Sequence, residues 1–211
     1  MRLQIALDGD LASSLAVLRA VRPSIDIAEI GTPLVLREGI AAARKIRAEF
    51  PDLTLLADFK IMDAGDEEAT IAFEAGCDLV TVLGVTHDAT LQGALVAARR
   101  FGKQIVVDLV GVRDLSARVG DLLNMGCDYL CIHTAHDVQA AQSPLHDLRQ
   151  IRATWPDAPL AVAGGINLTT LDSVLELSPA IVVVGSAITK AAKPAEIAQV
   201  IHDRISSYDR V

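Results

Sequence analysis

Short runs of valine, isoleucine and leucine recur at regular intervals along this chain, and longer segments with helical spacing separate them. Apolar runs of this length are typical of strands that are buried on both faces and joined by crossover helices. Eight runs fit this description: Leu3–Leu7, Ile25–Ile30, Leu53–Ala57, Leu79–Leu83, Gln104–Leu109, Tyr129–Ile132, Leu160–Ala163 and Ile181–Val184. Eight such units predict an α/β fold closed into a (β/α)8 TIM barrel, and an open doubly wound sheet is the weaker alternative.

An internal echo supports a repeated strand and helix unit. Residues 74–80, Glu-Ala-Gly-Cys-Asp-Leu-Val, are similar to residues 124–130, Asn-Met-Gly-Cys-Asp-Tyr-Leu. Each segment reads as a helix end, a glycine stop and the start of a buried strand. No Gly-rich or Pro-rich linker divides the 211 residues, whose number suits one core. We therefore expect residues 1–211 to form a single barrel domain.

Composition argues against two classes of partner. The formal net charge is −8 without a compensating basic cluster, and aromatic residues make up only 3% of the chain, so nucleic acid is not expected to bind. Hydrophobic residues reach 51%, yet no apolar stretch approaches the roughly 20 residues of a membrane-spanning helix. A small molecule is the expected partner.

Cysteine usage and the first residues indicate the compartment. Cys77, Cys127 and Cys131 form an odd count with no CxxC pair, and each stands in or beside an apolar run. Buried thiols in a reducing compartment are the expected state. The sequence enters a strand-like pattern at once, without the pattern of a signal peptide. We expect a cytoplasmic protein.

Polar residues stand at the ends of most of the predicted strands. In a parallel barrel these C-terminal ends converge on one mouth. Any single polar residue there could be a satisfied polar group or a helix cap, but several buried carboxylates are costly unless they share a cation, a lysine or a substrate. The group therefore predicts an active site. Its members are Asp8, Glu29, Asp58, Lys60, Asp108 and His133.

Two features of this group indicate its chemistry. Glu29 and Asp58 follow neighbouring strands and form the best pair for one hard divalent cation, Mg²⁺ or Mn²⁺, which keeps water or substrate oxygens as further ligands. Lys60 stands between Asp58 and Asp63 in one short segment. Such neighbours raise a lysine pKa, which favours an electrostatic role over a Schiff base. A solvated ion pair beyond the strand is the structural alternative.

Two glycine turns predict a phosphate site. Ala163-Gly164-Gly165 follows the seventh strand and Gly185-Ser186 follows the eighth, where barrels often bind phosphate. Glycine lets the backbone approach an anion, and a following helix start offers free N–H groups. Both turns could instead be simple tight turns. His133 ends the sixth strand and is the expected proton carrier, with His136 close behind it.

The motif Asp-x-Lys-x-x-Asp, formed by Asp58, Lys60 and Asp63, is the mark of the orotidine 5′-monophosphate decarboxylase suprafamily, which this chain resembles along essentially its whole length. Glu-Ile-Gly-Thr at 29–32 and Ala-Asp-x-Lys-Ile-x-Asp-Ala-Gly at 57–65 look like its metal-dependent branch. That branch contains enzymes that add formaldehyde to D-ribulose 5-phosphate and enzymes that decarboxylate 3-keto-L-gulonate 6-phosphate.

Three positions bear on the choice between these activities. Asp108 and Ala163 are similar to the formaldehyde-adding enzymes, since the decarboxylases typically have Glu and Thr there. His136 stands where those decarboxylases have an arginine, and neither His136 nor Ser186 is typical of either group. The resemblance therefore favours reversible aldol addition through a 1,2-enediolate, with the decarboxylation of 3-keto-L-gulonate 6-phosphate as the alternative.

The resemblance also implies roles for individual residues. His133 would be the base, Glu29 and Asp58 would bind the metal, and the partner would be a phosphosugar together with formaldehyde. The other catalytic residues expected are Asp8, Lys60, Asp63 and Asp108, and the substrate-binding residues expected are His136, Ala163, Gly164, Gly165, Gly185 and Ser186. A homodimer is implied, in which Asp63 enters the neighbouring site.

Two further functions are alternatives to the aldol reaction. A ribulose-phosphate 3-epimerase is also a phosphosugar barrel, but it is expected to present metal-binding histidines near the second and third strands, where this chain has Glu29 and Asp58. A non-catalytic phosphosugar-binding barrel would bind its ligand without exchanging the proton on the first carbon of the sugar.

Overall fold

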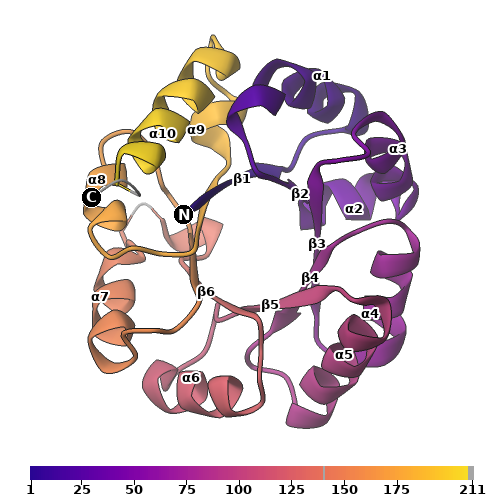
Figure 1. Cartoon of the computed structure of the whole chain (residues 1–211), viewed down its shortest axis with the longest axis vertical. Helices are drawn as coiled ribbons and strands as arrows, with labels where there is room; N and C mark the ends of the chain where they lie inside the picture. The colour runs from indigo at the N-terminus through magenta and orange to yellow at the C-terminus, as the bar shows by residue number, and fades with distance from the viewer. Residues whose placement is uncertain (140, 209–211) are drawn as a thin grey trace.

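The chain folds into a closed barrel of parallel strands surrounded by helices (Figure 1), in a computed structural model that describes residues 1–139 and 141–208. The strands follow one another around the barrel in chain order, and the last pairs with the first. This confirms the predicted (β/α)8 TIM barrel; residues 140 and 209–211 of the predicted domain lie outside the described residues. The strands are β1 (Arg2–Leu7), β2 (Ile27–Ile30), β3 (Thr54–Ile61), β4 (Leu79–Leu83), β5 (Gln104–Asp108), β6 (Tyr129–His133), β7 (Leu160–Ala163) and β8 (Ile181–Val184).

Helices occupy the gaps between successive strands and form the outer ring (Figure 1). Across the described ranges, none of them combines the length and apolar content that crossing a bilayer requires. The α-helices are α1 (Leu11–Val21), α2 (Thr32–Glu38), α3 (Ala41–Glu49), α4 (Gly65–Glu74), α5 (Asp88–Phe101), α6 (Leu115–Asn124), α7 (Leu145–Thr154), α8 (Leu171–Leu175), α9 (Ser186–Thr189) and α10 (Pro194–Tyr208). Short 3₁₀ turns, η1 (Arg22–Ser24) and η2 (His136–Val138), precede β2 and follow β6.

Alternating strand residues build two apolar layers. One set packs outward against the helices, and the other fills the barrel interior, so the barrel is a packed core and not a pore. The three cysteines are buried and free, as predicted. The interior set consists of Ile27, Leu56, Leu79, Val106, Cys131, Ala161, Ile181 and Val183.

The predicted end of β3 is wrong in a way that matters for the site. The apolar run ends at Ala57, but the strand continues to Ile61, which pairs with Val82 of β4 after a register shift. Lys60 has a positive φ of 48° within this irregular stretch. Asp58 and Lys60 therefore lie inside an irregular strand end and not beyond it. Pairing with β4 at Ala57, before them, and at Ile61, after them, anchors their backbone to the sheet.

Aspartates clamp the opposite rim, where the strands begin. Asp26, Asp78 and Asp128 each precede an even-numbered strand. Their carboxylates accept the backbone N–H of Leu3 (2.8 Å), Leu55 (2.9 Å) and Ile105 (3.0 Å), respectively. The segments that echo each other in the sequence thus hold equivalent places in the barrel. The repeat is broken before β8, where Ala180 stands and only its carbonyl accepts the N–H of Arg2.

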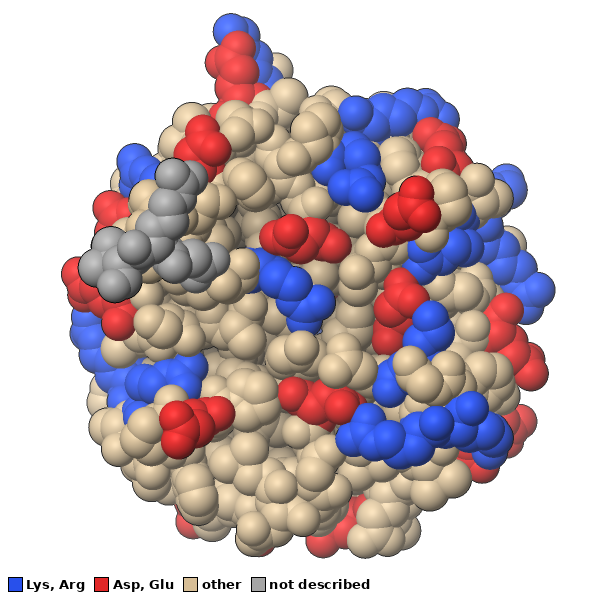
Figure 2. Space-filling view, viewed as in Figure 1, with Lys and Arg blue, Asp and Glu red and all other residues tan. Residues whose placement is uncertain are grey.

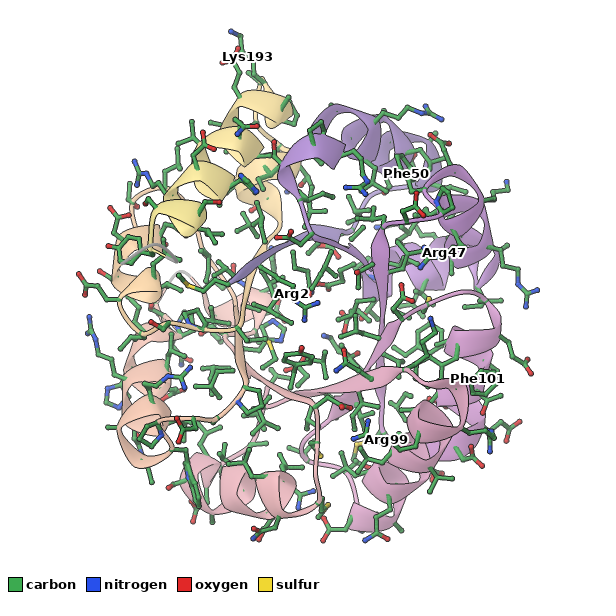
Figure 3. The ribbon with its side chains drawn as sticks, viewed as in Figure 1. Arg2, Arg47, Phe50, Arg99, Phe101 and Lys193 are labelled. Atoms are coloured by element: carbon green, nitrogen blue, oxygen red, sulfur yellow. The ribbon has the colours of Figure 1, made fainter. Side chains whose placement is uncertain are left out.

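Basic side chains complete two of these clamps. Arg47 and Lys103 both bind the carboxylate of Asp78, and Arg99 binds Asp128. Figures 2 and 3 look onto this rim: Lys and Arg side chains lie beside Asp and Glu side chains, and Arg2 lies near the centre of the ring with Arg47 and Arg99 farther out. Burial raises the pKa of Asp78, but its hydrogen bonds with Lys103 and Leu55 and the charge of Arg47 outweigh burial and leave the pKa lowered.

We expect Asp78→Ala to lower the free energy of unfolding by about 2 kcal/mol at pH 7, because a backbone N–H and two cations lose a shared acceptor. A carboxyl whose pKa is depressed by folding stabilises above its unfolded pKa of about 3.9, and this contribution disappears as the pH falls through the folded value. The difference from wild type, measured by urea unfolding, should therefore shrink below about pH 4. Asp52→Ala, at an exposed position with no ion pair among the described residues, is the control. An effect no larger than that of the control would contradict the clamp.

Candidate active site

A cavity of about 1070 Å³ opens at the C-terminal ends of the strands. It brings together predicted site residues from β2, β3, β5, β6 and β7 and from the loops that follow β1, β6, β7 and β8, with the exception of Asp63. The predicted residues that line it are Asp8, Glu29, Asp58, Lys60, Asp108, His133, His136, Ala163, Gly164, Gly165, Gly185 and Ser186.

A continuous chain of polar contacts crosses this cavity. Lys60 Nζ lies 3.0 Å from Asp58 Oδ1 and 3.0 Å from Asp108 Oδ2. The same Asp108 oxygen lies 2.9 Å from His133 Nδ1. One carboxylate oxygen, on the last residue of β5, therefore links the lysine of β3 to the histidine that ends β6.

The ionisation of Lys60 follows from these contacts. Burial lowers the pKa of Lys60, but the carboxylates of Asp58 and Asp108 outweigh burial and raise it above its usual value. The sequence predicted Asp63 as the second carboxylate beside Lys60, which is wrong. Asp108, at the end of β5, takes that place. The ammonium form is retained near neutral pH, and a cationic lysine is a poor imine-forming nucleophile.

Asp108 is held ionised by the same arrangement. Burial raises its pKa, yet His133, Lys60 and the N–H of Val110, which donates at 2.9 Å, together leave the pKa of Asp108 lowered. With Asp108 ionised, Nδ1 of His133 is assigned as the donor. The lone pair of the imidazole then resides on Nε2, the nitrogen not engaged by Asp108, which is the arrangement that a general base requires.

Glu29 and Asp58 differ in how many hydrogen bonds from the protein stabilise their carboxylates. Asp58 accepts hydrogen bonds from Thr32 Oγ1 (2.8 Å), Thr81 Oγ1 (2.8 Å) and Lys60. Glu29 accepts only one, from Gln4 Nε2 at 2.6 Å, among the residues that the structure describes. Burial and the nearby carboxylate of Asp58 raise the pKa of Glu29 to about 8. The negative charge of this pair is thus under-compensated by the chain itself.

The donor set fits a hard divalent cation with few protein ligands. Within residues 1–139 and 141–208, no three His, Cys, Asp or Glu side chains gather into an all-protein metal cage. Mg²⁺ commonly binds through one or two carboxylates and fills its other positions with water or substrate oxygens. A cation beside Glu29 and Asp58 would supply the missing positive charge.

Sequence reasoning missed the residues that hold these carboxylates. Thr32 and Thr81 both bond to Asp58, and Gln4 bonds to Glu29. Thr81 could have been noticed as the polar residue inside the apolar run of β4. Gly31 belongs to the motif at 29–32, but its role was not predicted: a Cβ on it would lie 2.1 Å from Asp8 Oδ1, so glycine is what lets the Asp8 carboxylate approach this loop.

The two glycine turns present free donors to the cavity. Gly164 and Gly165 have positive φ values of 103° and 71°, and a Cβ on Gly164 would lie 2.4 Å from the carbonyl oxygen of Thr134. Among the described residues, the N–H groups of Gly165 and Ser186 donate to no acceptor. Free N–H groups lining one side of a cavity suit an anion. His136 lies at the rim with its side chain 92% exposed.

Asp63 lies outside the cavity of its own barrel. It is exposed after the end of β3, and its Oδ1 accepts the N–H of Ala64 at 2.8 Å. It lines a shallow groove formed with α4 and α5. The structure therefore separates Asp63 from the other predicted positions of its own barrel; its expected entry into the site of a neighbouring subunit stays a prediction.

The closed barrel, with an acidic cavity and an Asp–His pair at its C-terminal mouth, defines a (β/α)8-barrel enzyme. The model of the "Orotidine 5'-phosphate decarboxylase / HUMPS family" matches residues 1–201, and the chain belongs to this family. It is 44% identical over 200 residues to 3-hexulose-6-phosphate synthase of Bacillus subtilis (strain 168), a match that covers 94% of this chain and 95% of the relative. A protein of the same name from Staphylococcus aureus (strain NCTC 8325 / PS 47) is 40% identical, with 94% and 96% covered.

Solved structures agree with this grouping. The crystal structure of 3-hexulose-6-phosphate synthase from Salmonella typhimurium has a TM-score of 0.96 at 44% identity and covers 99% of this chain and 100% of its own. The crystal structure of 3-keto-L-gulonate-6-phosphate decarboxylase from Vibrio cholerae has a TM-score of 0.87 at 26% identity, with 98% of each chain covered. The relatives named as synthases are thus considerably more similar to this chain than this decarboxylase.

Proposed function

We propose that this protein catalyses the reversible aldol addition of formaldehyde to D-ribulose 5-phosphate, which gives D-arabino-3-hexulose 6-phosphate. The observation that carries the proposal is the position of Asp108, whose one oxygen lies 3.0 Å from Lys60 and 2.9 Å from His133. The names of relatives 40–44% identical over most of the chain support the choice of reaction.

His133 serves as the base. Its Nε2 removes a proton from C1 of the ketose, and Asp108 stabilises the resulting imidazolium through Nδ1–H. The electrons left at C1 form an enediolate, whose negative charge develops in the cavity lined by Lys60. C1 then attacks the carbon of formaldehyde, a C–C bond forms, and the proton on His133 returns to the former formaldehyde oxygen. The step is redox-neutral and consumes no proton.

The remaining residues bind and orient the substrate. Glu29 and Asp58 would hold Mg²⁺ or Mn²⁺, and when bound this cation supplies positive charge where the enediolate develops. Asp8 lines the same cavity beside the β2–α2 loop, where it can accept hydrogen bonds from sugar hydroxyls. The free N–H groups of Gly165 and Ser186 would bind the phosphate, and the sugar would extend across the same cavity to bring C1 to His133.

The test of the reaction is a side-by-side assay of both candidate substrates. We expect formaldehyde consumption in the presence of D-ribulose 5-phosphate, with a kcat/KM at least about 100-fold above that for carbon dioxide release from 3-keto-L-gulonate 6-phosphate, a ratio equivalent to about 2.7 kcal/mol. The reverse ratio would make the protein the decarboxylase. Epimerisation at C3 without aldol addition would indicate a ribulose-phosphate 3-epimerase.

We expect His133→Asn to reduce exchange of the C1 proton of D-ribulose 5-phosphate with solvent deuterium by about 100-fold or more, because the base is lost. Phosphosugar binding should stay within about twofold of wild type, since the phosphate turns lie on other strands. NMR of the sugar in D₂O measures the exchange, and calorimetry measures the binding.

The matched control is His136→Asn, which removes the imidazole three residues farther along, at an exposed site. We expect it to keep most of the exchange. Undiminished exchange in His133→Asn would move the base elsewhere, with His136 the first candidate, and no exchange even in wild type would favour a non-catalytic binding barrel.

We expect exhaustive chelation to lower activity by at least about 100-fold and added Mg²⁺ or Mn²⁺ to restore it, because the carboxylates of Glu29 and Asp58 would otherwise face an anionic intermediate without compensation. Glu29→Gln should lose most activity and respond little to added cation. Full activity after metal removal, verified by elemental analysis, would refute the metal assignment.

We further propose a homodimer in which Asp63 completes the site of the neighbouring subunit. Asp63 is exposed, lies outside its own cavity and is flanked by the exposed apolar side chains of Met62 and, on α4, Ile71. A twofold axis at this surface would repeat the contact in both directions and bring each Asp63 toward the partner's mouth.

We expect Asp63→Ala and Asp58→Ala each to be nearly inactive alone and to regain activity when refolded together. In a hybrid dimer, the subunit carrying Asp63→Ala keeps its own Asp58 and receives an intact Asp63, so one of the two sites works. Hybrid dimers are separated from the parent dimers by means of a charge tag on one subunit, and their activity is then assayed. Inactive hybrids would show that Asp63 serves its own subunit or no site.

A further inference from the structure

The charges that line the cavity leave a phosphate with little opposing charge. Among the described lining residues, four are carboxylates and three are lysine or arginine. A phosphate monoester adds between one and two negative charges near neutral pH. Backbone N–H groups of the glycine turns orient such an anion, but they carry no net charge. The cation proposed at Glu29 and Asp58 would compensate those two carboxylates, so a free cationic side chain beside the glycine turns is the group suited to the phosphate.

Two of the three cationic side chains are already engaged. Lys60 binds Asp58 and Asp108 at 3.0 Å each. Arg37 keeps its charge, but Nη1 donates to the carbonyl oxygen of Asp8 at 2.6 Å, which ties the guanidinium to the loop after β1. The third, Lys190, forms no side-chain hydrogen bond or ion pair with residues 1–139 or 141–208.

The short helix α9 directs Lys190 to the side where the phosphate is expected. The backbone N–H of Lys190 donates to the carbonyl oxygen of Ser186 at 3.0 Å, and this hydrogen bond closes one helical turn. Residues four apart lie on the same helix face, and both Ser186 and Lys190 line the cavity. Ser186 itself is short and neutral, so this turn contributes no charge other than that of Lys190.

Lys193 provides a contrast within the same segment. It pairs with Glu196 at 2.7 Å and does not line the cavity. In Figure 3 it projects from the edge of the molecule, away from the ring of strands. The two lysines thus carry the same charge, but only one of them can contact a ligand held by the glycine turns.

We propose that Lys190 is the phosphate-binding cation of this site, and that it selects phosphorylated over unphosphorylated sugars. The inference rests on the proposed phosphosugar function, which it deepens by naming the residue that neutralises the phosphate. The side chain of Lys190 would form a charge-assisted hydrogen bond with one phosphate oxygen, while the N–H groups of Gly165 and Ser186 bind the other phosphate oxygens.

The test measures equilibrium binding without formaldehyde, so it does not depend on aldol activity. Calorimetry with D-ribulose 5-phosphate, with inorganic phosphate as competitor, compares wild type with Lys190→Gln, Lys190→Arg and the control Lys193→Gln. Lys190→Gln should weaken binding of both ligands roughly tenfold, as expected for loss of one charge-assisted hydrogen bond. Lys190→Arg should stay within about threefold, and Lys193→Gln should match wild type.

Two further measurements distinguish loss of the lysine charge from a structural effect of the substitution. The difference in binding affinity between wild type and Lys190→Gln should narrow as salt is raised, because the lysine is exposed and its charge is screened. Binding of unphosphorylated D-ribulose should be equally weak in both proteins. If Lys190→Gln binds as tightly as Lys193→Gln, or if wild type fails to bind either phosphate ligand, the proposal is overturned. Tight phosphosugar binding without aldol activity would instead support Lys190 and refute only the proposed reaction.

Discussion

The site depends on the carboxylate of Asp108, which is shared by Lys60 and His133. This one carboxylate joins side chains from three strands, and the ionisation of Lys60 and Asp108 depends on the contact between them. Lys60 stays cationic because two carboxylates oppose its burial, and Asp108 stays anionic because a lysine, a histidine and a backbone N–H oppose its own burial. Removing Lys60 would leave the buried carboxylates of Asp58 and Asp108 without their shared cation, which is costly in a site of low dielectric.

The barrel makes this sharing possible. Residues at the C-terminal ends of β3, β5 and β6 approach one another because closure brings those ends into one ring. The irregular end of β3 adds a second requirement. Lys60 adopts a positive φ in a stretch whose pairing with β4 resumes at Ile61, and its backbone N–H donates to Thr81 Oγ1 at 2.8 Å. The same hydroxyl donates to Asp58 Oδ1, so Thr81 fixes both the backbone and the carboxylate.

The fold and all four carboxylates among the described lining residues could be predicted from the sequence, since strand order and the convergence of strand ends follow from periodicity and closure. Pairings within the cavity could not. The near neighbour Asp63 was expected to hold Lys60, whereas Asp108, 48 residues away, does so, because sequence proximity says nothing about which strand ends face one another across the barrel. The roles of Thr32 and Gln4 could not be predicted for the same reason: the function of an uncharged side chain is clear only once its acceptor lies beside it.

Acidic side chains at the two ends of the barrel differ in how far the chain compensates their negative charge. At the rim where strands begin, Asp78 is satisfied by Arg47, Lys103 and a backbone N–H, and its pKa is lowered. At the mouth, burial and the charge of Asp58 raise the pKa values of Asp8 and Glu29. Carboxylates that the chain compensates fully contribute stability, whereas carboxylates that it leaves under-compensated cost stability until another positive charge or a hydrogen-bonding ligand arrives. Within the mouth the same contrast separates Asp108, whose charge the chain compensates, from Asp8 and Glu29, which are therefore the acids that a cation or a ligand hydroxyl would stabilise.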